Sequence, residues 1–208
     1  MHATRISLPS DHAVVVTMDQ RQSRGGDDIL EEHRRELNRR YRSSLVRSFV
    51  RTAGDEMQGV ANDAGWLVDL VLRETREARW WIGIGVGPFD PPLGRSARDS
   101  RGLAFYRARE AVERAKRAPW GFAFSGAGLV GQAEDCLALT SFVVRTRTER
   151  QHEAVECYRE VGQANEAAAR LGISPPSMSE RLRGAGLMEE DAGRRVAAYL
   201  LGQVAERP

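Results

Sequence analysis

A turn signal between two short helical patterns does most to limit the folds open to this chain. Residues 163–183 read QANEAAARLGISPPSMSERLR. Ala168 is small enough for a second helix to approach closely, and Gly172, four residues later, suits a sharp turn. Ser174 can cap the next helix, and Pro175 fits its first position, where a missing N–H costs nothing. Together these features predict a helix-turn-helix.

The second helix of this motif would pack through Met178 and Leu182, which are four residues apart. A helix over about Glu149–Val161 would support it and complete a three-helix unit. The arrangement resembles the helix-turn-helix of bacterial transcription factors, including the fourth region of sigma factors. An exposed helix of this kind enters the major groove of double-stranded DNA, where arginine reads guanine and hydroxyl groups reach phosphates. The candidate DNA-binding residues are Ser174, Ser177, Ser179, Glu180, Arg181 and Arg183.

Charge does not decide between DNA binding and a helix-turn-helix used for packing or protein contact. The whole chain has 31 Lys plus Arg against 29 Asp plus Glu, and Lys116 is its only lysine. Arg145–Pro208 has ten arginines and ten acidic residues, so this part is neutral. DNA binding remains the favoured interpretation, because a few well-placed arginines suffice.

Composition excludes several classes of protein. A hydrophobic content of 41% with a net charge of +2 argues against disorder. No run of ~18 apolar residues is present, so no membrane span is expected, and residues 1–12 lack the apolar run of a signal peptide. The two cysteines and four histidines have no metal-ligand spacing. A cytoplasmic protein is expected.

Strand and helix patterns alternate before residue 130. The order β-α-β-β-α-β-α-β predicts an α+β fold of ferredoxin-like type, an antiparallel sheet with helices on one face. Two glycines inside WWIGIGV indicate that another backbone approaches this strand closely. Expected domains are residues 1–130 for the sheet, 131–149 for a connecting helix and 150–208 for an all-α helix-turn-helix domain. Strands are expected over 13–18, 46–52, 57–60, 80–86 and 120–125, and helices over 28–45, 62–79 and 102–117.

Two carboxylates stand out by position in the predicted sheet. Asp19 ends the first strand, and Asp55 lies in the turn of the following hairpin. On antiparallel strands they would face each other across ~5 Å. A divalent cation would relieve their repulsion, and Mg²⁺ is commonly held by one or two carboxylates plus phosphates. Glu56 could add a further oxygen. The alternative is that Asp19 caps a loop and Asp55 only shapes the turn.

The order of these pieces resembles the class III nucleotide cyclase domain and, more closely, the SatD-like family built on it. The resemblance implies that Asp19 and Asp55 match metal-binding aspartates, that Arg109 falls near a transition-state arginine, and that Mg²⁺ or Mn²⁺ would accompany a nucleotide. It covers roughly half of the chain, through the stretches VVVTMDQRQSR (14–24), RTAGDEMQGV (51–60), WIGIGVG (81–87) and RGLAFYRAREAVERAK (101–116).

The chain departs from the cyclase pattern at two places. Phe105 stands where a cyclase has the asparagine that orients the ribose, and Lys116, at a helix end, is no convincing purine-selecting lysine. Losing one such donor typically costs ~2.7–4 kcal/mol of barrier, so efficient cyclase activity is not expected. The loop arginines Arg95, Arg98 and Arg101 could hold a phosphate, or could simply be solvated.

The favoured hypothesis is a DNA-binding transcriptional regulator whose cyclase-like domain forms a homodimer and senses a nucleotide. The alternative is a metal-dependent nucleotidyl transferase or cyclase with the helical tail as a packing module. A third hypothesis is a protein-interaction scaffold without DNA or nucleotide binding.

Overall fold

The computed structural model describes residues 8–21 and 29–203, and β-branched and apolar runs form one five-stranded sheet in the order β2-β3-β1-β4-β5. The strands are β1 (His12–Gln20), β2 (Leu45–Arg51), β3 (Glu56–Ala61), β4 (Trp80–Pro88) and β5 (Phe122–Ser125). Neighbouring strands run antiparallel except β4 and β5, which are parallel. The α+β class is confirmed, but the prediction of a wholly antiparallel sheet is wrong. A crossover helix between β4 and β5 returns the chain so that both strands point the same way.

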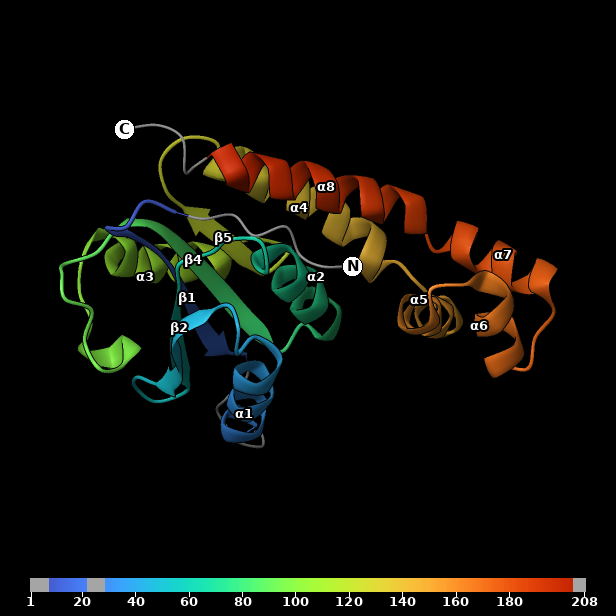
Figure 1. Cartoon of the computed structure of the whole chain (residues 1–208), viewed down its shortest axis with the longest axis horizontal. Helices are drawn as coiled ribbons and strands as arrows, with labels where there is room; N and C mark the ends of the chain where they lie inside the picture. Colours follow the sequence, from blue (N-terminus) through green and yellow to red (C-terminus); the bar gives the residue numbers. More distant parts are fainter. Residues whose placement is uncertain (1–7, 22–28, 204–208) are drawn as a thin grey trace.

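Four helices accompany the sheet (Figure 1). They are α1 (Leu30–Arg40), α2 (Leu67–Glu77), α3 (Leu103–Ala115) and α4 (Val130–Arg145). A short 3₁₀ helix, η1 (Ala97–Asp99), lies in the loop between β4 and α3. The expected start of the first helix, near residue 28, lies outside the described residues.

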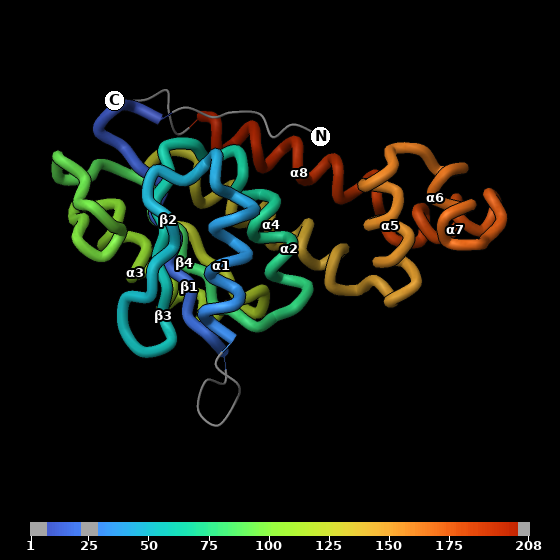
Figure 2. The backbone as a smooth tube through the Cα atoms, turned by 60° about the horizontal axis from the view of Figure 1, so that its bottom comes forward, coloured from blue at the N-terminus to red at the C-terminus, as the bar shows by residue number. Residues whose placement is uncertain are grey.

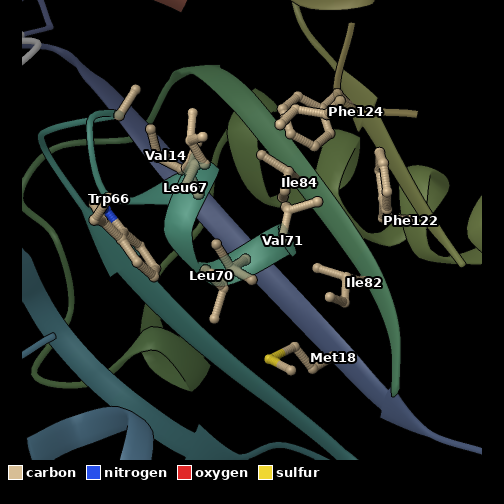
Figure 3. Packing of buried hydrophobic residues seen from close by; sticks show 14 of the residues in the cluster. Val14, Met18, Trp66, Leu67, Leu70, Val71, Ile82, Ile84, Phe122 and Phe124 are labelled. Atoms are coloured by element: carbon tan, nitrogen blue, oxygen red, sulfur yellow. The ribbon is translucent and has the colours of Figure 1, made fainter. Parts of the chain in front are cut away.

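One face of the sheet carries the main hydrophobic core (Figure 3). Side chains alternate along each strand, so Val14 and Met18 of β1 share this face with Ile82 and Ile84 of β4. Helix α2 lies against them with a buried stripe at helical spacing: Leu67, Leu70 and Val71. This face therefore holds α2, and the buried residues of α1 and α4 join the same cluster.

The opposite face is covered by α3, so the prediction of helices on one face is wrong. The reason lies in β4, which beyond Trp81 presents only glycines to this face. A Cβ on Gly83 would lie 2.2 Å from the backbone N of Val112, and one on Gly85 would lie 2.1 Å from the carbonyl oxygen of Ala104. The close backbone approach expected from these glycines is confirmed. Helix α3 sits directly on the bare strand.

Four further helices follow the sheet in the described part of the chain (Figures 1 and 2). Helices α5, α6 and α7 have their own small core, separate from the main one. The last helix belongs to both, because Leu187 at its start joins the small core and Leu201 at its end joins the main core. The helices are α5 (Glu149–Val161), α6 (Ala164–Arg170), α7 (Pro175–Gly184) and α8 (Leu187–Gly202).

The predicted segment 150–208 therefore spans two packing units. Helix α4 lies on the sheet rather than standing free between domains, with Ala133 and Leu137 in the main core. Helix α8 runs back along α4, as both views of the backbone agree (Figures 1 and 2).

A buried carboxylate joins these units where α4, α5 and α8 meet. The side chain of Glu190 is 2% exposed and forms ion pairs with Arg147 (Nη2–Oε2, 2.7 Å), Arg159 (Nη2–Oε1, 3.1 Å) and Arg194 (Nε–Oε1, 2.6 Å). Burial alone would raise the pKa of Glu190, but the three guanidinium groups hold it below its usual value. Arg194 also reaches Asp69 of α2 at 3.6 Å.

Candidate functional site

The helix-turn-helix core forms because small residues of α6 admit α7. Ala167 and Ala168 are buried, and Met178 and Leu182 of α7 pack in the same cluster. Ala154 of α5 lies in this cluster too, so α5 is the supporting helix that the sequence predicts. A capping box at Thr148 and Gln151 begins α5. The Thr-x-x-Gln spacing in the sequence is a signal for the N-terminus of a helix.

The turn between the two helices follows the predicted chemistry. Gly172 has φ +64°, a left-handed conformation that side chains other than glycine adopt at a cost. Ser174 is the N-cap of α7, and its hydroxyl accepts a hydrogen bond from the backbone N–H of Ser177 at 3.3 Å. Pro175 is the first helical residue.

The outer side of α7 differs slightly from the expected reading face. Ser174, Ser179, Glu180 and Arg183 are exposed, whereas Ser177 and Arg181 are half-buried. The guanidinium of Arg181 is 3.8 Å from the carboxylate of Glu153 on α5, and its side chain is only 23% exposed. Arg183, expected at the margin of the face, is thus the arginine that α7 presents to solvent.

The side of this unit formed by α5 is acidic. Glu149, Glu153, Glu156 and Glu160 recur at helical spacing and line a shallow hollow of about 260 Å³. Arg76 of α2 pairs with Glu149 and Glu156 across it. Arg170 pairs with Glu160 and Arg181 with Glu153, so each of the four carboxylates faces an arginine.

The sheet carboxylates lie close together, but in a different register from the predicted one. Asp19 pairs across the strands with Glu56, and Asp55 lies one residue outside β3, where its carbonyl accepts a hydrogen bond from the N–H of Gln20 at 3.2 Å. The turn closes at Ala53, which accepts from the N–H of Glu56, so the strand begins at Glu56 and not at Asp55. The expected direct pairing of Asp19 with Asp55 is therefore wrong.

Lysine occupies the space beside Asp19. The Nζ of Lys116 lies 2.8 Å from Oδ2 of Asp19 and 2.8 Å from Oε1 of Glu113. Burial opposes the charge of this ammonium, but its hydrogen bonds to both carboxylates raise its pKa above the usual value. The hydroxyl of Thr52 donates a hydrogen bond to the carboxylate of Glu56. A divalent cation bound at Oδ2 of Asp19 would have to displace Lys116.

The remaining candidates lie on the same side of the sheet domain as α3. Arg109 is exposed on α3, seven residues before Lys116, so about two turns, or ~10 Å, separate them along one helix face. Arg95, Arg98 and Arg101 are exposed in the loop before α3. This loop is anchored by the buried Ala97 and by Arg47 of β2, whose guanidinium donates to the Gly94 carbonyl.

Over residues 8–21 and 29–203, no group of three or more His, Cys, Asp or Glu side chains is arranged to hold a metal ion. Over the same residues, no helix combines the length and the apolarity that crossing a membrane requires. Mg²⁺ or Mn²⁺ binding and nucleotide binding stay predictions.

Comparison with known proteins leaves the family open. No protein-family model matches the chain, and no curated protein matches it. Among solved structures, the chain is similar to a regulator of polyketide synthase expression from Bifidobacterium adolescentis, with 13% sequence identity and a TM-score of 0.31. The match covers 94% of this chain and 82% of the other. A similarity at this level assigns no function, and the resemblance to the SatD-like family stays a prediction.

Proposed function

We propose that this protein is a dimeric, DNA-binding transcriptional regulator that reads double-stranded DNA with α7. The observation that carries the proposal is the pairing of α6 and α7 around a left-handed Gly172, with Ser174, Ser179 and Arg183 on the open side of α7. A helix supported in this way can enter the major groove while its flanks contact the backbone.

Each exposed group of α7 has a matching function on DNA. The guanidinium of Arg183 can donate two hydrogen bonds to guanine O6 and N7, and Glu180 can accept from cytosine N4. The hydroxyls of Ser174 and Ser179 can donate to phosphates, which position a protein without specifying sequence.

The test of the proposal is a selection of duplex fragments from a random library on the purified full-length protein, at ~50 mM and ~200 mM salt. Because counterion release weakens non-specific binding steeply over this range, recognition requires a sequence that survives the higher salt. We expect a two-fold symmetric site, since a dimer places two reading helices on half-sites ~34 Å apart or at multiples of this spacing. If binding of all fragments decreased to the same extent at the higher salt, the proposal would be contradicted.

Arg183→Ala is expected to weaken binding to the selected site by about five-fold to 150-fold, because a bidentate contact to guanine contributes ~1–3 kcal/mol. Arg39→Ala removes another exposed arginine, from α1, and is the matched control. Fluorescence anisotropy with labelled duplex gives both affinities. Equal losses in the two variants would mean that only net charge matters.

The sheet domain enters the proposal as the part that senses a nucleotide. The support is that Arg109 lies on the α3 side of the sheet about two turns from Lys116, which pairs with Asp19, while the loop arginines lie at the other end of α3. A nucleoside triphosphate with Mg²⁺ is expected to change the affinity for the selected site at least a few-fold, through its preference for one state of the protein. The same anisotropy titration with and without each nucleotide measures it, and unchanged affinity with all four would contradict sensing.

A further inference from the structure

The helix pair α4–α8 exposes an unusual amount of apolar side chain. Five of the seven large hydrophobic side chains that stand out from the surface of the described residues lie on these two helices, with exposures between 49% and 82%. We call them the α4–α8 face; they are Leu139, Phe142, Met188, Val196 and Tyr199.

Four of these side chains are placed on one side of the pair by the helix contact, and Met188 is exposed at the start of α8. The two helices meet at Cys136 and Gly193, where the cysteine Sγ is 3.5 Å from the glycine carbonyl oxygen. Leu139 and Phe142 follow Cys136 by three and six residues, and Val196 and Tyr199 follow Gly193 by the same steps.

Each residue turns a helix by about 100°, so equal steps give equal rotations away from the line of contact. Helix α8 runs antiparallel to α4, because Gly186 lies beside Val143 and Gly193 beside Thr140. In an antiparallel pair, equal rotations from the contact line point to the same side. The opposite side is buried through Leu137 and Leu201. The α4–α8 face is therefore one continuous outward surface.

The size of this surface matches what a stable dimer needs. Large side chains offer ~150–250 Å² each when fully accessible, so five of them at these exposures present on the order of 600 Å². A standard interface takes ~800 Å² from each partner, and about 65% of a homodimer interface is apolar. Its composition agrees too, because aromatic residues and Met are enriched at interface cores.

The charges around the face favour a second copy over an anionic partner. Two acidic residues, Asp135 and Glu189, and one basic residue, Arg195, are exposed beside it. A nucleic acid or an acidic lipid surface requires an excess of Lys and Arg, which this face lacks. An isologous interface presents the same face twice, so acids of one copy are available to Arg195 of the other.

We propose that two copies of this chain associate through their α4–α8 faces, each burying Leu139, Phe142, Met188, Val196 and Tyr199 against the other. This interface supplies the second reading helix that the proposed function requires. Its test uses no DNA, so DNA binding can fail while the interface holds, and a dimer formed through another face would overturn the interface while leaving the proposed function intact.

The test is sedimentation equilibrium of the full-length chain over a range of concentrations. We expect the wild type to have the mass of two copies, and Leu139→Glu and Phe142→Glu each to raise the dimer dissociation constant about tenfold or more. Tyr106→Glu, at the equally exposed Tyr106 of α3, is the control and is expected to remain dimeric. Thermal melts followed by circular dichroism verify that each variant is folded. We expect all three to fold, because the substituted side chains are exposed.

A wild type with the mass of one copy at every concentration would overturn the interface. A dimer unaffected by either glutamate substitution would overturn it as well, by placing the contact elsewhere. Equal dissociation in Tyr106→Glu would attribute the effect to added charge and not to this face.

Discussion

Gly85→Ala is expected to lower the free energy of unfolding by more than about 3 kcal/mol, which is the upper range for overpacking. The added Cβ would lie 2.1 Å from the carbonyl oxygen of Ala104 and 2.4 Å from the backbone N of Ala108. Both atoms belong to the backbone of α3, so no side-chain rotation relieves the contact. Either the helix lifts from β4 or the strand bends, and both open the packing between them.

Gly131→Ala is the matched control for this substitution. Gly131 lies near the start of α4, and a Cβ there meets nothing within 4 Å. Alanine favours a helix over glycine by up to ~1 kcal/mol, so this variant is expected to be at least as stable as the wild type. Urea unfolding followed by circular dichroism measures both. Similar midpoints for the two variants would contradict the close packing of α3 on β4.

Glu190→Ala is expected to cost about 3–5 kcal/mol, because it leaves the buried guanidinium of Arg147 without a carboxylate partner. Arg147 suffers most, since its side chain is only 4% exposed and its charge has little access to water. Glu189→Ala removes the neighbouring exposed carboxylate and is expected to change stability by less than about 0.5 kcal/mol. Urea unfolding distinguishes them, and equal losses would show that the network contributes little.

The contribution of Glu190 to stability should also depend on pH. The pKa of Glu190 is lowered in the folded chain, so its ionised form contributes stability above the ordinary glutamate value of ~4.3. That contribution disappears as the pH falls through the lowered value. The unfolding free energy of the wild type should therefore decrease more steeply below about pH 4.5 than that of Glu190→Ala. Parallel curves would contradict the assigned role.

Local signals in the sequence predicted most helices and strands. Contacts between elements far apart in the chain decided the features that the sequence did not predict. The expected helix over Glu149–Val161 matches α5, since a capping threonine precedes it and Gly162 ends it in a left-handed conformation. The direction of β5 depends on how α3 crosses the sheet, which no local pattern encodes. The two glycines of β4 did predict a close neighbour, but not on which face it would lie.

Candidate site residues were harder to place than elements. The register of the hairpin depends on the turn hydrogen bonds that join Glu56 to Thr52 and Ala53, and a shift of one residue exchanged Asp55 for Glu56 opposite Asp19. Arg181 has the spacing of a reading residue, but Glu153, from a helix 28 residues earlier, holds it. The i,i+4 pair of Glu190 and Arg194 is typical of a solvated helix, and only the tertiary fold buries it.

Helix α8 begins in the small core and ends in the main one, with two residues between it and α7. Such a helix would transmit a change in the orientation of one core to the other. A tilt of the sheet domain against its partner in a dimer would be carried along α8 as a rigid rotation and would change the spacing and the angle between two α7 helices. If the protein binds DNA as proposed, operator preference would be set in part by residues that never approach DNA, and substitutions at the Leu201 end of α8 would alter which half-site spacing it selects.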